Sequence, residues 1–161
     1  MGQRSNAIAD RIEQGAKGLA AFAEGLSDAD WKKVVKPDGR TVGVMINHVA
    51  SVYPIEIQLA QGVASGKAMT GVTYEGAVKD MNAKHAADNA AVGKAETVAL
   101  LRSNSKVAAD AVRKMSDAEL DRAAPVSLNS DAVLTAQFVL EDHAVRHSWH
   151  HLAKAKGALA R

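Results

Sequence analysis

The sequence contains no cysteine among its 161 residues. This absence excludes a disulfide framework, cysteine-ligated zinc, iron–sulfur clusters, covalent haem attachment and catalysis by a thiol of the protein itself. A chain of this length buries roughly 70 % of the surface that its unfolded form exposes, so it can build a core without such cross-links. The length is also typical of one domain, and we expect residues 1–161 to form a single helical bundle domain.

Aromatic residues are scarce, at 4 %, and neither sign of charge dominates, since 20 Lys and Arg face 18 Asp and Glu. A nucleic-acid groove combines a strong positive field with aromatic rings for base stacking, so we expect no nucleic-acid partner. No segment approaches the roughly 20 consecutive apolar residues of a membrane span. Residues 1–15 mix both signs of charge and do not resemble a secretory signal. The sequence therefore predicts a cytoplasmic protein with no membrane partner.

Alanine is abundant, proline occurs at only three positions, and β-branched residues are sparse, a composition that favours helix. Apolar spacing and capping residues predict four long helices, over about residues 5–24, 41–63, 94–114 and 135–159. They also predict a further helix over about 73–89 and short helical turns after Ser27 and Ser116, with a loop over 123–130. The predicted fold class is all-α: a four-helix bundle with an additional helix and short helical turns.

Four of the six histidines lie close together near the C-terminus: His143, His147, His150 and His151. On a helix, side chains four residues apart are neighbours, whereas His143 and His151 are separated by about 12 Å along the axis. One metal ion can therefore be shared by His143 and His147 or by His147 and His151. The spacing alone leaves both pairs open.

A third ligand is available on the helix predicted over 41–63. His48 lies in an apolar stripe with Val44, Met45, Val52 and Ile55, which places it toward the bundle interior. Three imidazoles with an open coordination position are typical of a catalytic zinc, nickel or iron site, at which a bound water or thiol has a lowered pKa. The alternative is that His48 is a hydrogen-bonded core residue and the other histidines are surface residues.

Other residues and the absence of several motifs limit which reactions the sequence supports. We expect His85 to face solvent, and neither Glu56 nor Asp142 is an evident general base. The Glu-x-x-His pattern of di-iron bundles is absent, and so is the HExxH motif of metalloproteases. Glycine-rich nucleotide loops and the G-x-S-x-G elbow are also absent. A nucleotide site or a serine hydrolase triad therefore has no support.

Four segments carry a resemblance that covers about residues 20–159: PDGRTVGVMINHVASVYP, DMNAKHAADNAA, LLRSNS and VSLNSDAVLTAQFVLEDHAVRHSWHHLAKAKGAL. In order and spacing they resemble the DinB family. The resemblance implies a four-helix bundle that holds a divalent metal between one histidine of the second long helix and an H-x-x-x-H pair of the last. It assigns these positions to His48, His147 and His151, because the family's small and basic tail matches the residues after His151.

The same resemblance sets the functional expectation. Family members include thiol transferases that use bacillithiol or mycothiol, and homodimers are common among them. We therefore expect a homodimeric, metal-dependent transferase or hydrolase that acts on a small electrophilic substrate. It would use a divalent ion (Zn, Ni or Fe) and, as a transferase, a low-molecular-weight thiol. The alternative is a non-catalytic metal-binding or stress-related helical bundle that acts as a dimeric interaction protein.

Overall fold

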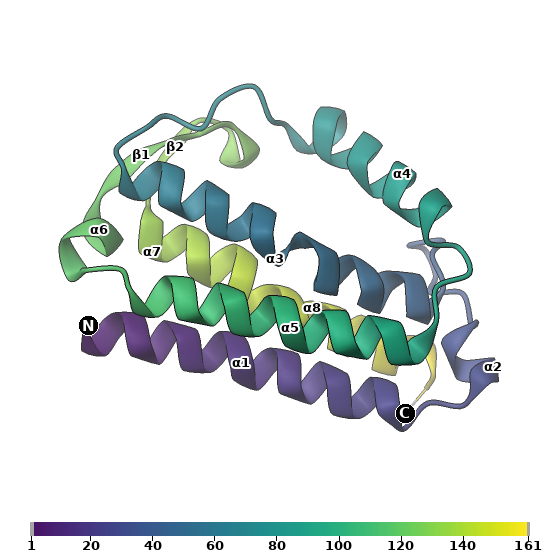
Figure 1. Cartoon of the computed structure of the whole chain (residues 1–161). Coiled ribbons are helices and arrows are strands. Elements are labelled where there is room, and N and C mark those ends of the chain that lie inside the picture. Colours follow the sequence, from purple (N-terminus) through teal and green to yellow (C-terminus); the bar gives the residue numbers. More distant parts are fainter. Residues whose placement is uncertain (1, 161) are drawn as a thin grey trace.

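The computed structural model describes residues 2–160 and is predominantly helical (Figure 1). Three long helices are α1 (Gln3–Glu24), α3 (Val42–Ala64) and α5 (Lys94–Arg113). The fourth is built from α7 (Ala136–Val139), the π-helical segment η3 (Leu140–Val145) and α8 (Arg146–Ala158). Helix α5 packs against both α1 and α3, and the fourth helix packs against the same two helices. The predicted all-α four-helix bundle is confirmed.

The shorter helices occur in the segments of the chain that connect the long ones. They are α2 (Asp28–Trp31), the π-helical turn η1 (Tyr74–Val78), α4 (Lys79–Asp88) and α6 (Asp117–Asp121). Capping explains where two of them begin, because Ser27 and Ser116 form capping boxes with Asp30 and Glu119. Helix α4 is the additional helix; it runs along the outside of α3 and contributes no fully buried residue (Figure 1).

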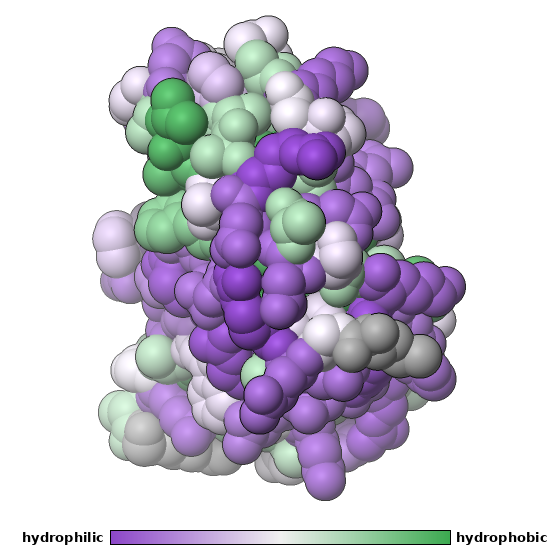
Figure 2. Space-filling model, turned by 90° about the vertical axis from the view of Figure 1, so that its left-hand side faces the viewer, coloured by the Kyte–Doolittle hydropathy of each residue, from purple (hydrophilic) through white to green (hydrophobic). Residues whose placement is uncertain are grey.

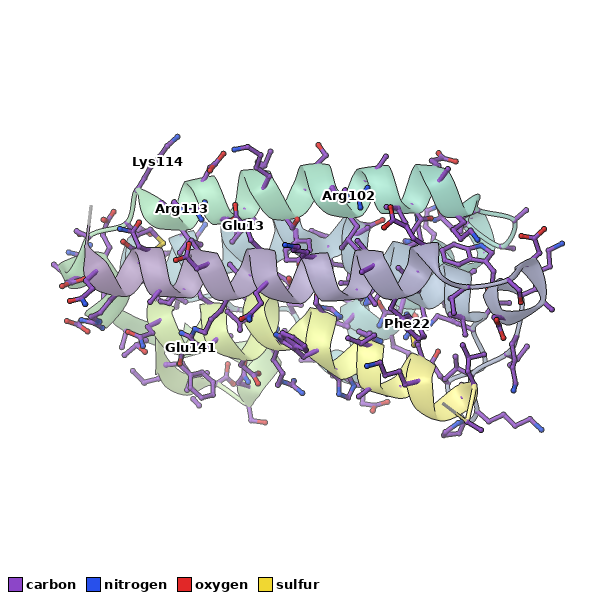
Figure 3. The ribbon with its side chains drawn as sticks, turned by 90° about the horizontal axis from the view of Figure 1, so that it is seen from below. Glu13, Phe22, Arg102, Arg113, Lys114 and Glu141 are labelled. Atoms are coloured by element: carbon purple, nitrogen blue, oxygen red, sulfur yellow. The ribbon has the colours of Figure 1, made fainter. Side chains whose placement is uncertain are left out.

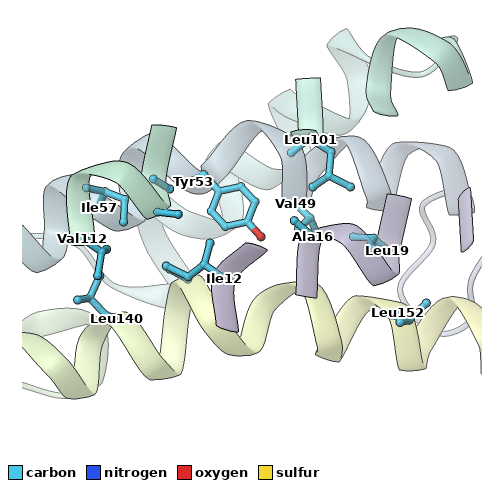
Figure 4. Packing of buried hydrophobic residues seen from close by; sticks show 14 of the residues in the cluster. Ile12, Ala16, Leu19, Val49, Tyr53, Ile57, Leu101, Val112, Leu140 and Leu152 are labelled. Atoms are coloured by element: carbon cyan, nitrogen blue, oxygen red, sulfur yellow. The ribbon is translucent and has the colours of Figure 1, made fainter. Parts of the chain in front are cut away.

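The core fills the space between the four long helices with small and branched side chains (Figure 4). Figure 4 shows Ile12 and Leu19 of α1 close to Val49 and Tyr53 of α3, with Leu101 of α5 nearby. The abundant alanines let the helices approach closely, which suits the dense packing of protein interiors. The glycine at position 43 has the same effect, because a Cβ there would collide with the indole of Trp31.

Helix α3 continues through Pro54 without ending. Proline has no backbone N–H, so the carbonyl of Ala50, four residues earlier, loses its helical partner. The side-chain amide of Asn104 on α5 donates to that carbonyl at 2.8 Å. A side chain of the neighbouring helix thus replaces the hydrogen bond that Pro54 removes.

A two-stranded hairpin joins α6 to α7, where the sequence predicted a loop over 123–130. Strands β1 (Ala123–Val126) and β2 (Ala132–Thr135) are antiparallel, and Ala123 pairs with Thr135. The backbone of Met69 pairs with β1 as well: its N–H donates to the carbonyl of Pro125, and its carbonyl accepts from the N–H of Ser127. The loop prediction was wrong because strands this short, one of them containing proline, carry no alternating pattern.

The surface is largely hydrophilic at the end of the molecule that carries the hairpin and α6, apart from a group of hydrophobic residues toward the hairpin (Figure 2). Val72, Val133 and Phe138 are exposed in this region. Ion pairs bridge neighbouring helices along the bundle (Figure 3). The side chain of Arg113 on α5 pairs with Glu13 on α1, and that of Arg11 on α1 pairs with Glu141 in η3. Within residues 2–160, no helix is both long and apolar enough to cross a membrane.

Candidate metal centre

Three histidines meet where α3 and α8 lie against each other. His48 lies on α3, a helix that begins at the Thr41 cap, whose side chain accepts from the N–H of Val44. His147 and His151 lie one turn apart on α8. One nitrogen of each ring lies within 4.8 Å of the corresponding nitrogens of the other two. The ring centroids are 5.1 Å apart for His48 and His147, and 4.7 Å apart for His147 and His151.

This geometry decides between the two histidine pairs that spacing left open. The group that could hold one ion contains His147 and His151, and His143 is outside it. His143 lies in η3 with its Nε2 buried and without a hydrogen-bond partner in residues 2–160. His150 is exposed, with its ring centroid 5.2 Å from that of His151, and it also lies outside the group. The structure thus brings together the three residues that the sequence singled out, and their binding of a metal stays a prediction.

The two buried histidines of the centre are neutral at ordinary pH. His48 and His151 are each only 5 % exposed. Loss of hydration, followed by the charge of nearby His147, lowers the pKa of His48 to about 3 and that of His151 to about 2. A neutral imidazole offers a nitrogen lone pair without first losing a proton, which is the form that binds a metal.

Glu56 gives the centre a fourth partner that the sequence did not identify. Its Oε1 is hydrogen-bonded to Nδ1 of His147, and its side chain is 8 % exposed. With Nδ1 engaged in this way, Nε2 of His147 is the nitrogen left for a ligand. A carboxylate behind a histidine ligand is the usual outer partner of a metal site, because it fixes the ring and raises its basicity. The sequence considered Glu56 only as a general base, and its contact with His147 is a different role that the sequence did not predict.

The donor set fits a divalent metal. Zinc, nickel and iron all accept imidazole nitrogen, and one ring nitrogen of the cluster, Nδ1 of His151, is buried and has no hydrogen-bond partner in the described chain. A buried polar atom without a partner is costly in a native structure. A ligand bound between the three imidazoles would give this buried nitrogen, or the other one of the same ring, a partner.

His85 lies at the edge of the centre, and the prediction that it faces solvent was wrong. Its ring is 5.6 Å from that of His48, and its Nε2 is hydrogen-bonded to Oδ1 of Asn47 at 2.9 Å. Asn47 is itself fixed, because its Nδ2 donates to Thr97 on α5. Helix α4 has no apolar stripe that would have shown which of its faces meets α3. The pairing of His85 with Asn47 therefore had no signal in the sequence.

Comparison with known proteins agrees with this fold. The family model of the DinB superfamily matches residues 11–155. The chain is similar to the solved structure of YfiT from Bacillus subtilis, described as a probable metal-dependent hydrolase with an unusual four-helix bundle topology. That likeness has a TM-score of 0.78 and 16 % sequence identity, and it covers 100 % of this chain and 89 % of the other. No curated protein matches the sequence.

Proposed function

The chain belongs to the DinB superfamily, and on this premise we propose that it is a metal-dependent enzyme. His48, His147 and His151 would hold one divalent ion, and the substrate would be a small electrophilic molecule. The reaction would be hydrolysis or the transfer of a low-molecular-weight thiol. The observation that carries the proposal is the convergence of three ring nitrogens within 4.8 Å.

The number of ligands supports a catalytic site over a structural one. Structural zinc sites are closed by four protein ligands, whereas catalytic sites use three and leave a position for water or substrate. Within the part of the chain that the structure describes, the group that could hold an ion has three members. The proposal of a non-catalytic metal-binding bundle would need a fourth ligand there.

A divalent ion bound here would supply Lewis acidity, which lowers the pKa of a coordinated water or thiol and polarises the substrate. The chain's own residues hold the geometry. Glu56 orients the ring of His147 through Nδ1. His85 is held at Nε2 by Asn47, and this leaves its Nδ1, which has no partner in residues 2–160, for a hydrogen bond to the substrate.

Two reactions share this arrangement and differ in the nucleophile. YfiT, a protein of similar fold, is described as a probable metal-dependent hydrolase; a shared fold is only an analogy for function. Thiol transfer would need a thiol from outside the chain, because the chain has no cysteine. Hydrolysis needs only water and is the simpler of the two.

The test is a rate measurement on protein loaded with zinc, nickel or iron(II). One assay follows the hydrolysis of 4-nitrophenyl acetate, and the other follows the coupling of cysteine to 1-chloro-2,4-dinitrobenzene. We expect at least one rate to depend on added metal and to fall at least 100-fold in His48→Ala. The exposed His150→Ala variant is the matched control and should keep the wild-type rate. Rates equal in wild type and His48→Ala for every metal would refute the proposal.

A further inference from the structure

A large groove lies beside the histidine centre. Its volume is about 1040 Å³, and its walls come from the segment that precedes α3, from η1 and α4, and from the C-terminal end of α8. Asn82 and Ala86, which flank His85 on α4, belong to its lining. Arg40, which directly precedes the Thr41 cap of α3, belongs to it as well.

The lining is strongly basic. It contains five cationic side chains and one carboxylate, Asp38, from the described residues: Lys33, Lys36, Arg40, Lys79 and Lys154. The excess of four positive charges in this one groove is larger than the net charge of +2 of the whole chain. A concave surface of one sign concentrates ligands of the opposite sign.

Arg40 presents a hydrogen-bond donor without an acceptor. Its Nε and Nη2 bind the two oxygens of Asp38 at 2.6 and 2.8 Å, which holds the guanidinium in one orientation. Its Nη1 is buried and has no partner in residues 2–160. Leaving a charged donor buried and unpaired is costly, and an anionic oxygen is the strongest acceptor for it.

The groove and the histidine centre are close neighbours. Lys154 of the lining lies three residues after His151 on α8, and Ala86 of the lining follows His85, whose ring is 5.6 Å from that of His48. The groove also has apolar parts in its lining, because Val34 and Tyr74 are 48 % and 63 % exposed. A molecule that fills it would combine an anionic group with an apolar body.

We infer that this groove binds the carboxylate or phosphate group of a small amphiphilic anion, with Nη1 of Arg40 as the central donor and the surrounding lysines as the attracting field. The inference rests on the proposed function in one respect, namely that this anion is the substrate whose reactive part reaches His48, His147 and His151. Anion binding itself needs only the groove.

The experiment is calorimetric titration of metal-free protein at low salt with phenyl phosphate, benzoate and the neutral benzyl alcohol. We expect the two anions to bind and the alcohol not to bind, and the affinity for the anions to fall as salt is raised. The double variant Lys36→Gln/Lys154→Gln should bind at least 10-fold more weakly. Arg40→Lys keeps a positive charge beside Asp38 but loses the planar fork, and should bind at least 5-fold more weakly.

The control is Lys114→Gln, which removes one positive charge at the opposite end of the bundle (Figure 3); its affinity should stay within 2-fold of wild type. Equal binding of benzyl alcohol, unchanged affinity in the groove variants, or anion binding only after metal loading would each overturn the inference. Anion binding without any metal-dependent turnover would refute the proposed function alone. Metal-dependent turnover without anion binding would refute only the inference that the groove binds an anion.

Discussion

Glu56 and His147 are 91 positions apart in the sequence and are hydrogen-bonded to each other inside the bundle, through Oε1 and Nδ1. The pair joins α3 to α8 at the level of the histidine centre. It fixes one candidate ligand through Nδ1 and leaves the other nitrogen of the ring, Nε2, for a metal ion. This contact supports the proposed role of His147 as a metal ligand, because an outer carboxylate raises the basicity of a ligating imidazole.

The first prediction concerns that pair. Glu56→Gln keeps the size of the side chain and removes its charge, so the His147 ring loses basicity and fixed orientation. We expect metal affinity to fall 10- to 100-fold, the range found for outer partners of metal ligands, with the helical circular dichroism unchanged. Competition with a chromophoric chelator measures the affinity. The exposed Glu24→Gln is the control, and an affinity equal to wild type in Glu56→Gln would contradict the role assigned to Glu56.

His85 gives a prediction of the opposite kind. It lies close to His48 but outside the group of three convergent nitrogens, so His85→Ala should bind the same amount of metal as wild type. Turnover in the assays above should fall at least 5-fold, because Nδ1 of His85 is no longer present to contact the substrate. Elemental analysis measures the metal content, and the hydrolysis and thiol-coupling assays measure turnover. Loss of metal from His85→Ala would show that the ligand set is misassigned.

The lowered pKa values of the buried histidines predict how the stability of the metal-free protein depends on pH. His48 and His151 have a pKa of about 3 and about 2 in the folded state, against about 6.5 in an unfolded chain. Between these values the unfolded state binds protons that the folded state does not, so stability falls as the pH drops below about 6.5 and continues to fall toward 3.

Urea denaturation between pH 7.5 and 4.5 measures this dependence. Each of the two histidines should contribute a slope of about 1 kcal/mol per pH unit in the lower part of that range. His151→Gln should make the dependence shallower, whereas the exposed His150→Gln should leave it nearly unchanged. A slope in His151→Gln as steep as in wild type would contradict the burial of a neutral His151.

A fourth prediction follows from the proline inside α3. Asn104→Ala removes the donor that serves the Ala50 carbonyl, and the free energy of unfolding should fall by about 1–2 kcal/mol. In a Pro54→Ala background the residue at position 54 has its own N–H for that carbonyl, so the same Asn104→Ala change should cost clearly less. Chemical denaturation of the four proteins measures the difference. Equal costs in both backgrounds would show that Asn104 does not replace the missing bond.

The long helices were predictable from the sequence because each buries a stripe of apolar residues at helical spacing. The stripe of α3 also placed His48 toward the interior, and helical geometry reduced the C-terminal histidines to two candidate pairs. Choosing between these pairs required either the family resemblance or the structure. Spacing along one helix does not say which turn of that helix faces His48.

Other parts of the site had no local signal. The partners Glu56 and His147 belong to different helices, and their meeting depends on the rotation and offset of α3 against α8. His85 lies on α4, which has no buried residue to indicate its inward face. The hairpin of β1 and β2 was missed for a related reason, because it is held by backbone pairing that short strands do not encode in their side chains.

Elemental analysis by plasma mass spectrometry measures whether His48, His147 and His151 hold one divalent ion. The protein is purified without a tag, chelator or nickel resin, reloaded in turn with zinc, nickel and iron(II), and compared with His48→Ala and the control His150→Ala. If the three histidines bind one ion, we expect about one ion per chain in wild type and in His150→Ala, and close to none in His48→Ala. A wild type without metal after all three reloadings, or a His48→Ala variant that retains a full equivalent, would contradict it.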